Sequence, residues 1–136
     1  MWNIFQIRSL RLALLSSLVS MSLLTAPSIF AAEVHTSKPF KGVKANTGTV
    51  SHSKQGNKMV LTLSNDFKPP EAPDAHWQVI DSKGNVYMLQ KLMLKGDKLL
   101  KSITLPSYIQ DVAKVQMWCA FAETNLGEAP FDKPVK

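Results

Sequence analysis

Cysteine and arginine are scarce in this 136-residue chain, which has one cysteine and only two arginines, Arg8 and Arg11. A single thiol cannot form a disulfide within the chain, so Cys119 is a buried structural residue, a reactive thiol, a metal ligand or an intermolecular partner. Beyond Arg11 every basic residue is a lysine, and these lysines are interspersed with acidic residues. Because no arginine remains there for forked contacts to phosphates or bases, we expect no nucleic-acid partner.

The chain also lacks the short motifs of several enzyme classes. It contains no Gly-x-Ser-x-Gly elbow, no phosphate-cradling glycine loop and no Cys-x-x-Cys pair. A nucleophilic cysteine would need a base within hydrogen-bond reach, and His76 is the best candidate for that base. Catalysis is therefore not the favoured interpretation, although a thiol-dependent enzyme stays among the alternatives.

The N-terminal segment has the order of a secretory signal peptide. Arg8 and Arg11 precede an apolar run over residues 12–24, and the small residues Ala31 and Ala32 follow. Serine and threonine interrupt this run, which falls short of the roughly 18 apolar residues of a membrane span, so a retained anchor is the weaker alternative. We predict a signal peptide over residues 1–31 and a single exported domain over residues 32–136, periplasmic or extracellular, without a membrane span.

The predicted exported domain has the spacing of turns that is typical of an all-β protein. Strand-like stretches, among them 86–95 and 98–105, alternate with glycine-containing turns, which also contain asparagine at 54–57 and 82–85 and aspartate at 95–97. This spacing predicts a single-domain antiparallel β-sandwich of about seven or eight strands. Residues 32–39 are expected to be poorly ordered, and residues 108–112 to form one helical turn.

The stretch Lys114–Phe131 (KVQMWCAFAETNLGEAPF) contains Cys119 and predicts a strand at its start. Strand side chains alternate, which places Val115, Met117, Cys119 and Phe121 on one face and Gln116, Trp118, Ala120 and Ala122 on the other. A free cysteine among large apolar neighbours behaves as a small hydrophobe. Burial of Cys119 is the default expectation.

Metal binding at Cys119 has weak support in the sequence. A blue-copper site needs one thiolate, two imidazoles and usually a methionine, with a histidine and the methionine after the cysteine. This chain has neither residue after Cys119, and a less regular site would use Cys119, His76 and either Met117 or Met88. Neither haem nor copper is indicated by the residues themselves, and His35 and His52 carry no signal of their own.

One loop gathers residue types that are common in binding sites. Asp66, Asp74, His76 and Trp77 flank it and could meet at one end of the sandwich. The rings of Trp77, Trp118 and Tyr87 could stack on a sugar or a planar cofactor, but aromatic rings more often fill a core.

Taken together, the motifs resemble those of the electron-transfer DM-thirteen domain, a small extracytoplasmic β module found beside DOMON domains in animals. The resemblance covers nearly all of residues 40–131 and rests on this ordered set: Phe40-Lys41-Gly42, Gly48-Thr49-Val50, Asp66-Phe67, Pro73-Asp74-Ala75-His76, Leu105-Pro106, Trp118-Cys119 and Leu126-Gly127. It implies a redox role for Cys119 beside the loops of Asp66 and of Pro73-Asp74-x-His76. The family often has a histidine before the Gly-Thr-Val motif, where this chain has Lys44, Ala45 and Asn46, which disfavours a bis-histidine haem.

The leading hypothesis is therefore an exported electron-transfer or redox accessory domain that acts through Cys119, with His76 and Trp118 nearby and a redox partner protein. The alternative is a non-redox binding or adhesion module in which Cys119 is structural and aromatic and acidic residues contact a sugar or protein partner.

Overall fold

Antiparallel pairing organises the chain into two four-stranded sheets. The computed structural model describes residue 26 and residues 31–95 and 98–136, and Ala31–Lys136 form one unit. The first sheet has the order β1-β2-β3-β8, and its strands are β1 (His35–Thr36), β2 (Val50–Gln55), β3 (Lys58–Leu63) and β8 (Ser102–Thr104). The second sheet has the order β10-β9-β4-β5, and its strands are β10 (Thr124–Val135), β9 (Val112–Cys119), β4 (Ala75–Ile80) and β5 (Val86–Lys91).

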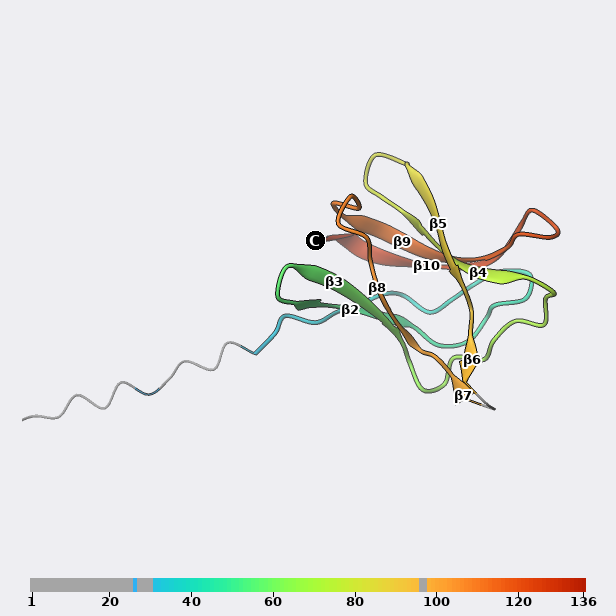
Figure 1. The fold of residues 1–136 in the computed structure, drawn as a ribbon, viewed down its shortest axis with the longest axis horizontal. Helices are drawn as coiled ribbons and strands as arrows, with labels where there is room; N and C mark the ends of the chain where they lie inside the picture. Colours follow the sequence, from blue (N-terminus) through green and yellow to red (C-terminus); the bar gives the residue numbers. More distant parts are fainter. Residues whose placement is uncertain (1–25, 27–30, 96–97) are drawn as a thin grey trace, which may run out of the picture. The chain divides into compact units, whose positions relative to one another are not determined.

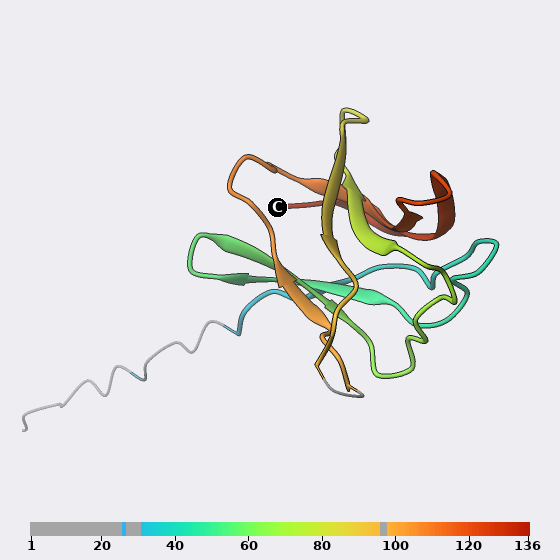
Figure 2. The ribbon, with the colours of Figure 1, turned by 45° about the vertical axis from the view of Figure 1, so that its right-hand side comes forward.

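The two sheets lie face to face, as Figures 1 and 2 show, which confirms the predicted all-β sandwich. Alternate residues of each strand point into the space between the sheets and form one apolar cluster. The largest fully buried side chains are Trp77, Phe40, Leu61, Leu63 and Met117. The β2–β3 turn and the C-terminus lie at one end of the sandwich, and the β9–β10 turn lies at the other (Figure 1).

Two hairpins form as their turn residues predict. Strands β2 and β3 pair from Val50↔Leu63 to Gln55↔Lys58, and Gly56 supplies a positive φ of 61° in the turn. In the β4–β5 hairpin, Asp81 Oδ1 accepts the backbone N–H groups of Lys83 and Asn85, and Gly84 has a φ of 85°. Such local bonds from aspartate to the following backbone favour a tight turn.

The long connection between β1 and β2 lies along an edge of the second sheet. Lys41 and Glu128 exchange both backbone hydrogen bonds, and the N–H groups of Lys44 and Ala45 donate to the carbonyl of Leu126. Part of the β10 edge is therefore paired with backbone, which limits edge-to-edge association there.

The structure corrects four details of the predicted element map. The two sheets of the sandwich have eight strands, as predicted, and a separate two-stranded sheet adds to them. The leading segment, which we expected to be poorly ordered, forms β1, and the next residue, Ser37, donates its N–H to the Val50 carbonyl. A tight turn replaces the predicted helical turn at 108–112, with the Ile109 N–H donating to the Pro106 carbonyl. The predicted strand over 86–95 ends at Lys91, and that over 98–105 divides. In the interval, β6 (Leu94–Lys95) and β7 (Lys98–Leu99) pair with each other as a short antiparallel ribbon.

Some predictions concern residues outside the described part. The signal peptide predicted over 1–31 falls there except for residues 26 and 31, and so do residues 96 and 97 of the predicted 95–97 turn. Among residues 31–95 and 98–136, no helix is long and apolar enough to cross a membrane.

Candidate functional site on the outer face of the second sheet

Strand register places Cys119 and His76 on opposite faces of the second sheet. Ala75 is the residue opposite Cys119 on the neighbouring strand, and His76 is opposite Trp118. Directly opposite residues in an antiparallel pair share a face, and successive residues alternate. Cys119 therefore faces the core with Ala75, whereas His76 faces outward with Trp118, so the structure does not bring the thiol and the imidazole together.

Cys119 lies in the hydrophobic core and is 1% exposed. It ends β9, and its Sγ accepts the backbone N–H of Ala122 at 3.5 Å. The expected burial of the thiol is confirmed. The strand ends at Cys119 because residues 120–123 turn the chain, so Phe121 does not share the cysteine's face as predicted but lies in the turn, 80% exposed.

Asp74, His76 and Lys91 form a charged cluster at the outer face. Asp74 Oδ1 lies 3.1 Å from His76 Nε2 and 3.2 Å from Lys91 Nζ. The other ring nitrogen of His76, Nδ1, lies 2.9 Å from the carbonyl oxygen of Leu89. The hydrogen bond from Lys91, assisted by His76, lowers the pKa of Asp74 although partial burial opposes this effect. The cluster therefore presents a carboxylate whose position is fixed from two sides.

Next to this cluster, a ladder of hydrogen-bonded side chains crosses three strands of the same face. Gln78 Nε2 donates to Gln116 Oε1 at 2.8 Å, and Gln116 Nε2 donates to Glu128 Oε2 at 2.7 Å. Lys114 Nζ lies 3.1 Å from the same carboxylate oxygen. The amide of Gln116, with help from Lys114, lowers the pKa of Glu128 against the opposing effect of burial. Both glutamines are buried, so the ladder stiffens the sheet beneath the surface side chains.

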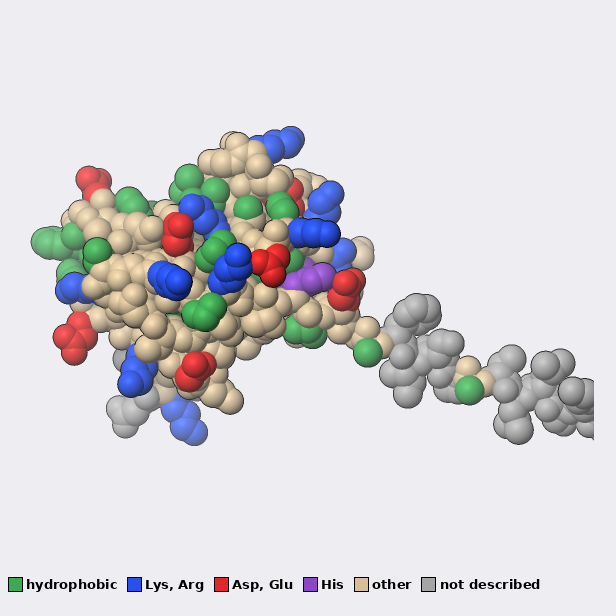
Figure 3. Space-filling model, turned by 180° about the vertical axis from the view of Figure 1, so that it is seen from behind, with side chains coloured by type: hydrophobic (Ala, Val, Ile, Leu, Met, Phe, Trp, Pro, Cys, Tyr) green, Lys and Arg blue, Asp and Glu red, His purple; other side chains and the backbone are tan. Residues whose placement is uncertain are grey.

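Exposed apolar side chains also lie at this face and its end. Met88 pairs with Gln78 across the strands and is 54% exposed, and Val86 pairs with Ile80 and is 57% exposed. Trp118 is half-buried beside His76. Ala120 N–H donates to the Asp74 carbonyl, which ties the turn of Phe121 to the charged cluster. Hydrophobic side chains gather at this end in the rear view (Figure 3).

The other candidates from the sequence lie elsewhere. Trp77 is 1% exposed and belongs to the core, and Tyr87 packs on the core edge with its hydroxyl on Asp81. Asp66 is held by Ser64 in the turn after β3, and no ion pair or hydrogen bond among the described residues joins it to Asp74. Met117 faces the core with Cys119, apart from His76. The suggested Cys119–His76–Met117 metal set is therefore not assembled.

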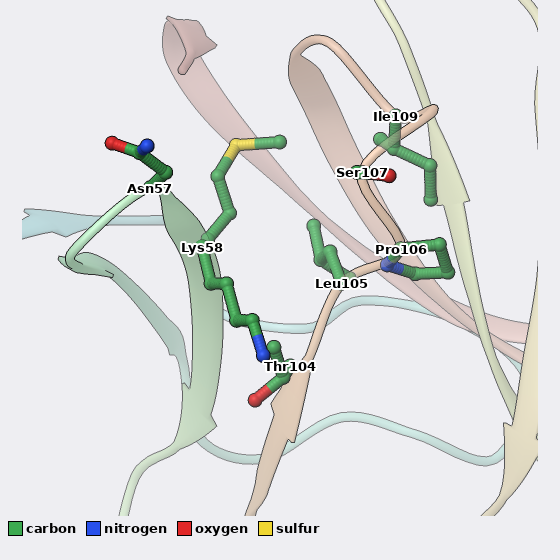
Figure 4. Close-up of a pocket in the computed structure, with 8 residues that line it drawn as sticks. Asn57, Lys58, Thr104, Leu105, Pro106, Ser107 and Ile109 are labelled. Atoms are coloured by element: carbon green, nitrogen blue, oxygen red, sulfur yellow. The ribbon is translucent and has the colours of Figure 1, made fainter.

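Two hollows lie away from the outer face. One, of about 380 Å³, lies at the end of the sandwich, and Figure 4 shows Asn57 and Lys58 on one side and Leu105, Pro106 and Ile109 on the other. A second, of about 470 Å³, lies between residues 34–36 and residues 131–135. Neither contains a residue of the charged cluster or the glutamine ladder.

Comparison with known proteins gives no match: no family model, no curated protein and no solved structure is similar to this chain. The resemblance to the DM-thirteen domain therefore stays a prediction from the motifs. The fold is an all-β sandwich, and the outer face of its second sheet carries both polar and apolar side chains.

Sequence reasoning missed the glutamine ladder and the position of Phe121. The outward alternation of Gln116 was visible, but its partners on β4 and β10 depend on register, which a single strand pattern does not specify. The turn at 120–123 contains no glycine or proline, and Glu123 takes a positive φ of 49°. This left-handed residue closes the β9–β10 hairpin without the usual turn signal.

Proposed function

We propose that the protein is an exported partner-binding module whose outer face of the second sheet contacts another protein. The observation that carries this proposal is the exposure of Met88 and Val86 along β5 and of Phe121 in the turn after β9, on the same sheet face as the half-buried Trp118 or at its end. Methionine and aromatic residues are enriched in protein interfaces.

The polar groups around these side chains support the same function. The Asp74–Lys91 pair and the Lys114–Glu128 pair lie at the outer face, with both signs of charge represented. Charges around an apolar patch favour the correct partner and orientation more than they add affinity. Because Gln78 and Gln116 stiffen the sheet below, little side-chain ordering is needed when a partner docks.

Site-specific photo-crosslinking in the exporting host tests this function. A photoreactive amino acid at position 88 or 121 is expected to give the same discrete protein adduct. The matched control places it at position 53, on the other sheet, where Ser53 pairs with Val60. The adduct at position 88 should disappear when Trp118→Ala is added, because aromatic anchors contribute most of the energy of an interface.

Adduct formation at position 53 equal to that at position 88, or an adduct that survives Trp118→Ala, would contradict the docking face. Retention of the protein on a polysaccharide gel, with loss of retention in Trp118→Ala and no adduct, would assign the same face to a sugar instead.

A second candidate is the electron-transfer or redox accessory role through Cys119, with a redox partner protein. The observation that favours it is the Ala122 N–H aimed at Cys119 Sγ in the turn that also exposes Phe121. Opening this turn would bring the thiol to the face on which a partner docks. Ultraviolet-visible spectra of oxidised and reduced protein test it: a redox-dependent band that Cys119→Ser abolishes supports a cofactor such as haem or copper at the thiol. Redox properties that Cys119→Ser leaves unchanged would exclude the role.

Export itself is part of the proposal. The signal-peptide pattern supports it, and the mass of the protein recovered from the periplasm or medium measures it. Cleavage after residue 31 or 32 is expected, and a full-length protein retained in the cytoplasm would contradict it.

A further inference from the structure

His52 lies in the interior of the first sheet, where a histidine is costly. It is 1% exposed and pairs with the fully buried Leu61 on β3. Among the described residues, neither its Nδ1 nor its Nε2 has a hydrogen-bonding partner. Buried polar side chains in proteins nearly always have at least one partner. The two ring nitrogens of His52 therefore indicate that a further group satisfies them.

A second imidazole lies beside the ring of His52. His35 on β1 is directly opposite His52, and the two ring centroids are 5.8 Å apart with the rings inclined by 30°. Opposite residues of an antiparallel pair share a face. The side chain of His35 is 42% exposed, so the pair consists of one buried and one accessible imidazole.

We propose that His35 and His52 together bind one transition-metal ion, with Cu²⁺ the tightest. Imidazole nitrogens bind such ions at about 2.0–2.1 Å, which places the centroids of two rings on one ion roughly 5–6 Å apart. The described residues contain no cluster of three or more histidine, cysteine or acidic side chains arranged for a metal. The protein therefore supplies two imidazole ligands, and imidazole ligands favour Cu²⁺ over Ni²⁺ and Zn²⁺.

The surroundings provide access and an orienting group. His35 lines the hollow of about 470 Å³ between β1 and the end of β10, so an ion can reach the ring of His35 from solvent. Glu33 Oε1 lies 3.5 Å from His35 Nε2. A carboxylate on one ring nitrogen orients the imidazole and makes the other nitrogen a better ligand.

The charges that face His52 act in two directions. Burial, followed by the positive charges of His35 and Lys54, lowers the pKa of His52 and keeps it in the neutral form that binds metals. Lys54 lies on the same face two residues along β2, and its ammonium repels a cation, which the carboxylate of Glu33 partly offsets. Replacing Lys54 by glutamine should therefore tighten metal binding, and Glu33→Gln should weaken it about tenfold.

Titration of the purified protein with CuCl₂ near neutral pH, against glycine as a weak competing ligand, tests the site. We expect saturable binding of one Cu²⁺, an electron paramagnetic resonance spectrum with nitrogen couplings from imidazole, and a higher melting temperature with the ion bound. His35→Gln should abolish the saturable binding. His76→Gln is the matched control, because His76 is a histidine on the other sheet, and it should bind Cu²⁺ as the wild type does.

His52→Leu should also abolish binding, and if that variant does not fold, His35→Gln at the sheet edge still decides. The proposal would be overturned by the absence of saturable Cu²⁺ binding in the wild type or by its retention in His35→Gln. Equal weakening in His35→Gln and His76→Gln would also overturn it, because it would show adventitious binding to surface histidines.

Discussion

The two faces of the second sheet are built from the same strands but have opposite character. On the inner face, Trp77, Met117 and Cys119 are each at most 1% exposed. On the outer face, one residue along each strand, His76 contacts Asp74, Gln116 accepts a hydrogen bond from Gln78, and the ring of Trp118 is half-buried opposite His76. The alternation of a strand therefore separates the lone thiol of Cys119 from the residues suited to binding, although Trp118 is its neighbour in the sequence.

We assign different roles to the residues of the two faces. Inner residues stabilise the fold, and their replacement should change the free energy of unfolding. Outer residues should change partner binding with small effects on stability, except where they belong to the buried glutamine ladder.

The largest expected effect is the difference in stability between variants of two tryptophans, one on each face. Trp77→Ala removes a fully buried ring and should lower the free energy of unfolding by about 3–5 kcal/mol. Trp118→Ala on the outer face should lower it by no more than about 1 kcal/mol, because the ring is half-buried. Urea denaturation of both variants measures the difference. Equal losses would mean that the two faces are not distinct.

Changing the thiol to a hydroxyl probes the inner face at Cys119. Cys119→Ser buries a polar group among apolar neighbours and should cost about 1–3 kcal/mol of unfolding free energy. Cys119→Ala is the control, since it introduces no polar group and should cost less. A serine variant as stable as the wild type would show that Cys119 is not a core residue in solution.

The glutamine ladder can be broken from one side or from both. Gln116→Ala leaves the buried amide of Gln78 without its acceptor and should cost about 1–3 kcal/mol. Replacing both glutamines with methionine and leucine removes both partners and should cost less than the single change. Chemical denaturation of the two variants decides. A double variant less stable than Gln116→Ala would refute the account of the ladder.

The smallest expected effect is a pH dependence that comes from the first sheet. The folded protein holds the pKa of His52 below its ordinary value of 6.5, so the unfolded chain binds the proton more readily. Stability from this residue is therefore complete above about pH 6.5 and is lost as the pH falls from there toward the folded pKa. Melting temperatures measured with a metal chelator present should show this decline in the wild type.

The control for this prediction is His52→Leu, whose melting temperature should be flat over the same range. Glu128 contributes to the pH dependence of stability at lower pH. Its pKa is held below the usual 4.5, so its contribution is complete above that pH and is lost as the pH falls through the folded value. A decline above pH 4.5 that persists in His52→Leu would contradict the assignment to His52.

Local patterns in the sequence predict the sandwich, the β2–β3 and β4–β5 hairpins and the burial of Cys119, because each depends on alternation and turn residues. The pairing of His76 with Trp118 instead of Cys119 depends on the register between β4 and β9, in which Gln78 and Gln116 pair although they are 38 residues apart in the sequence. Composition does not encode that register. His52 illustrates the same limit, since its pairing with His35 exists only because the leading segment forms β1.

The reactivity of Cys119 toward a thiol reagent in the native protein tests the central claim most directly, namely that the inner face is structural and the outer face is the functional one. If the claim holds, the thiol reacts only as fast as the protein opens, and its rate rises with urea in parallel with unfolding. Complete reaction of native protein at the rate of a free thiol, independent of urea, would contradict it and would favour the redox role of Cys119.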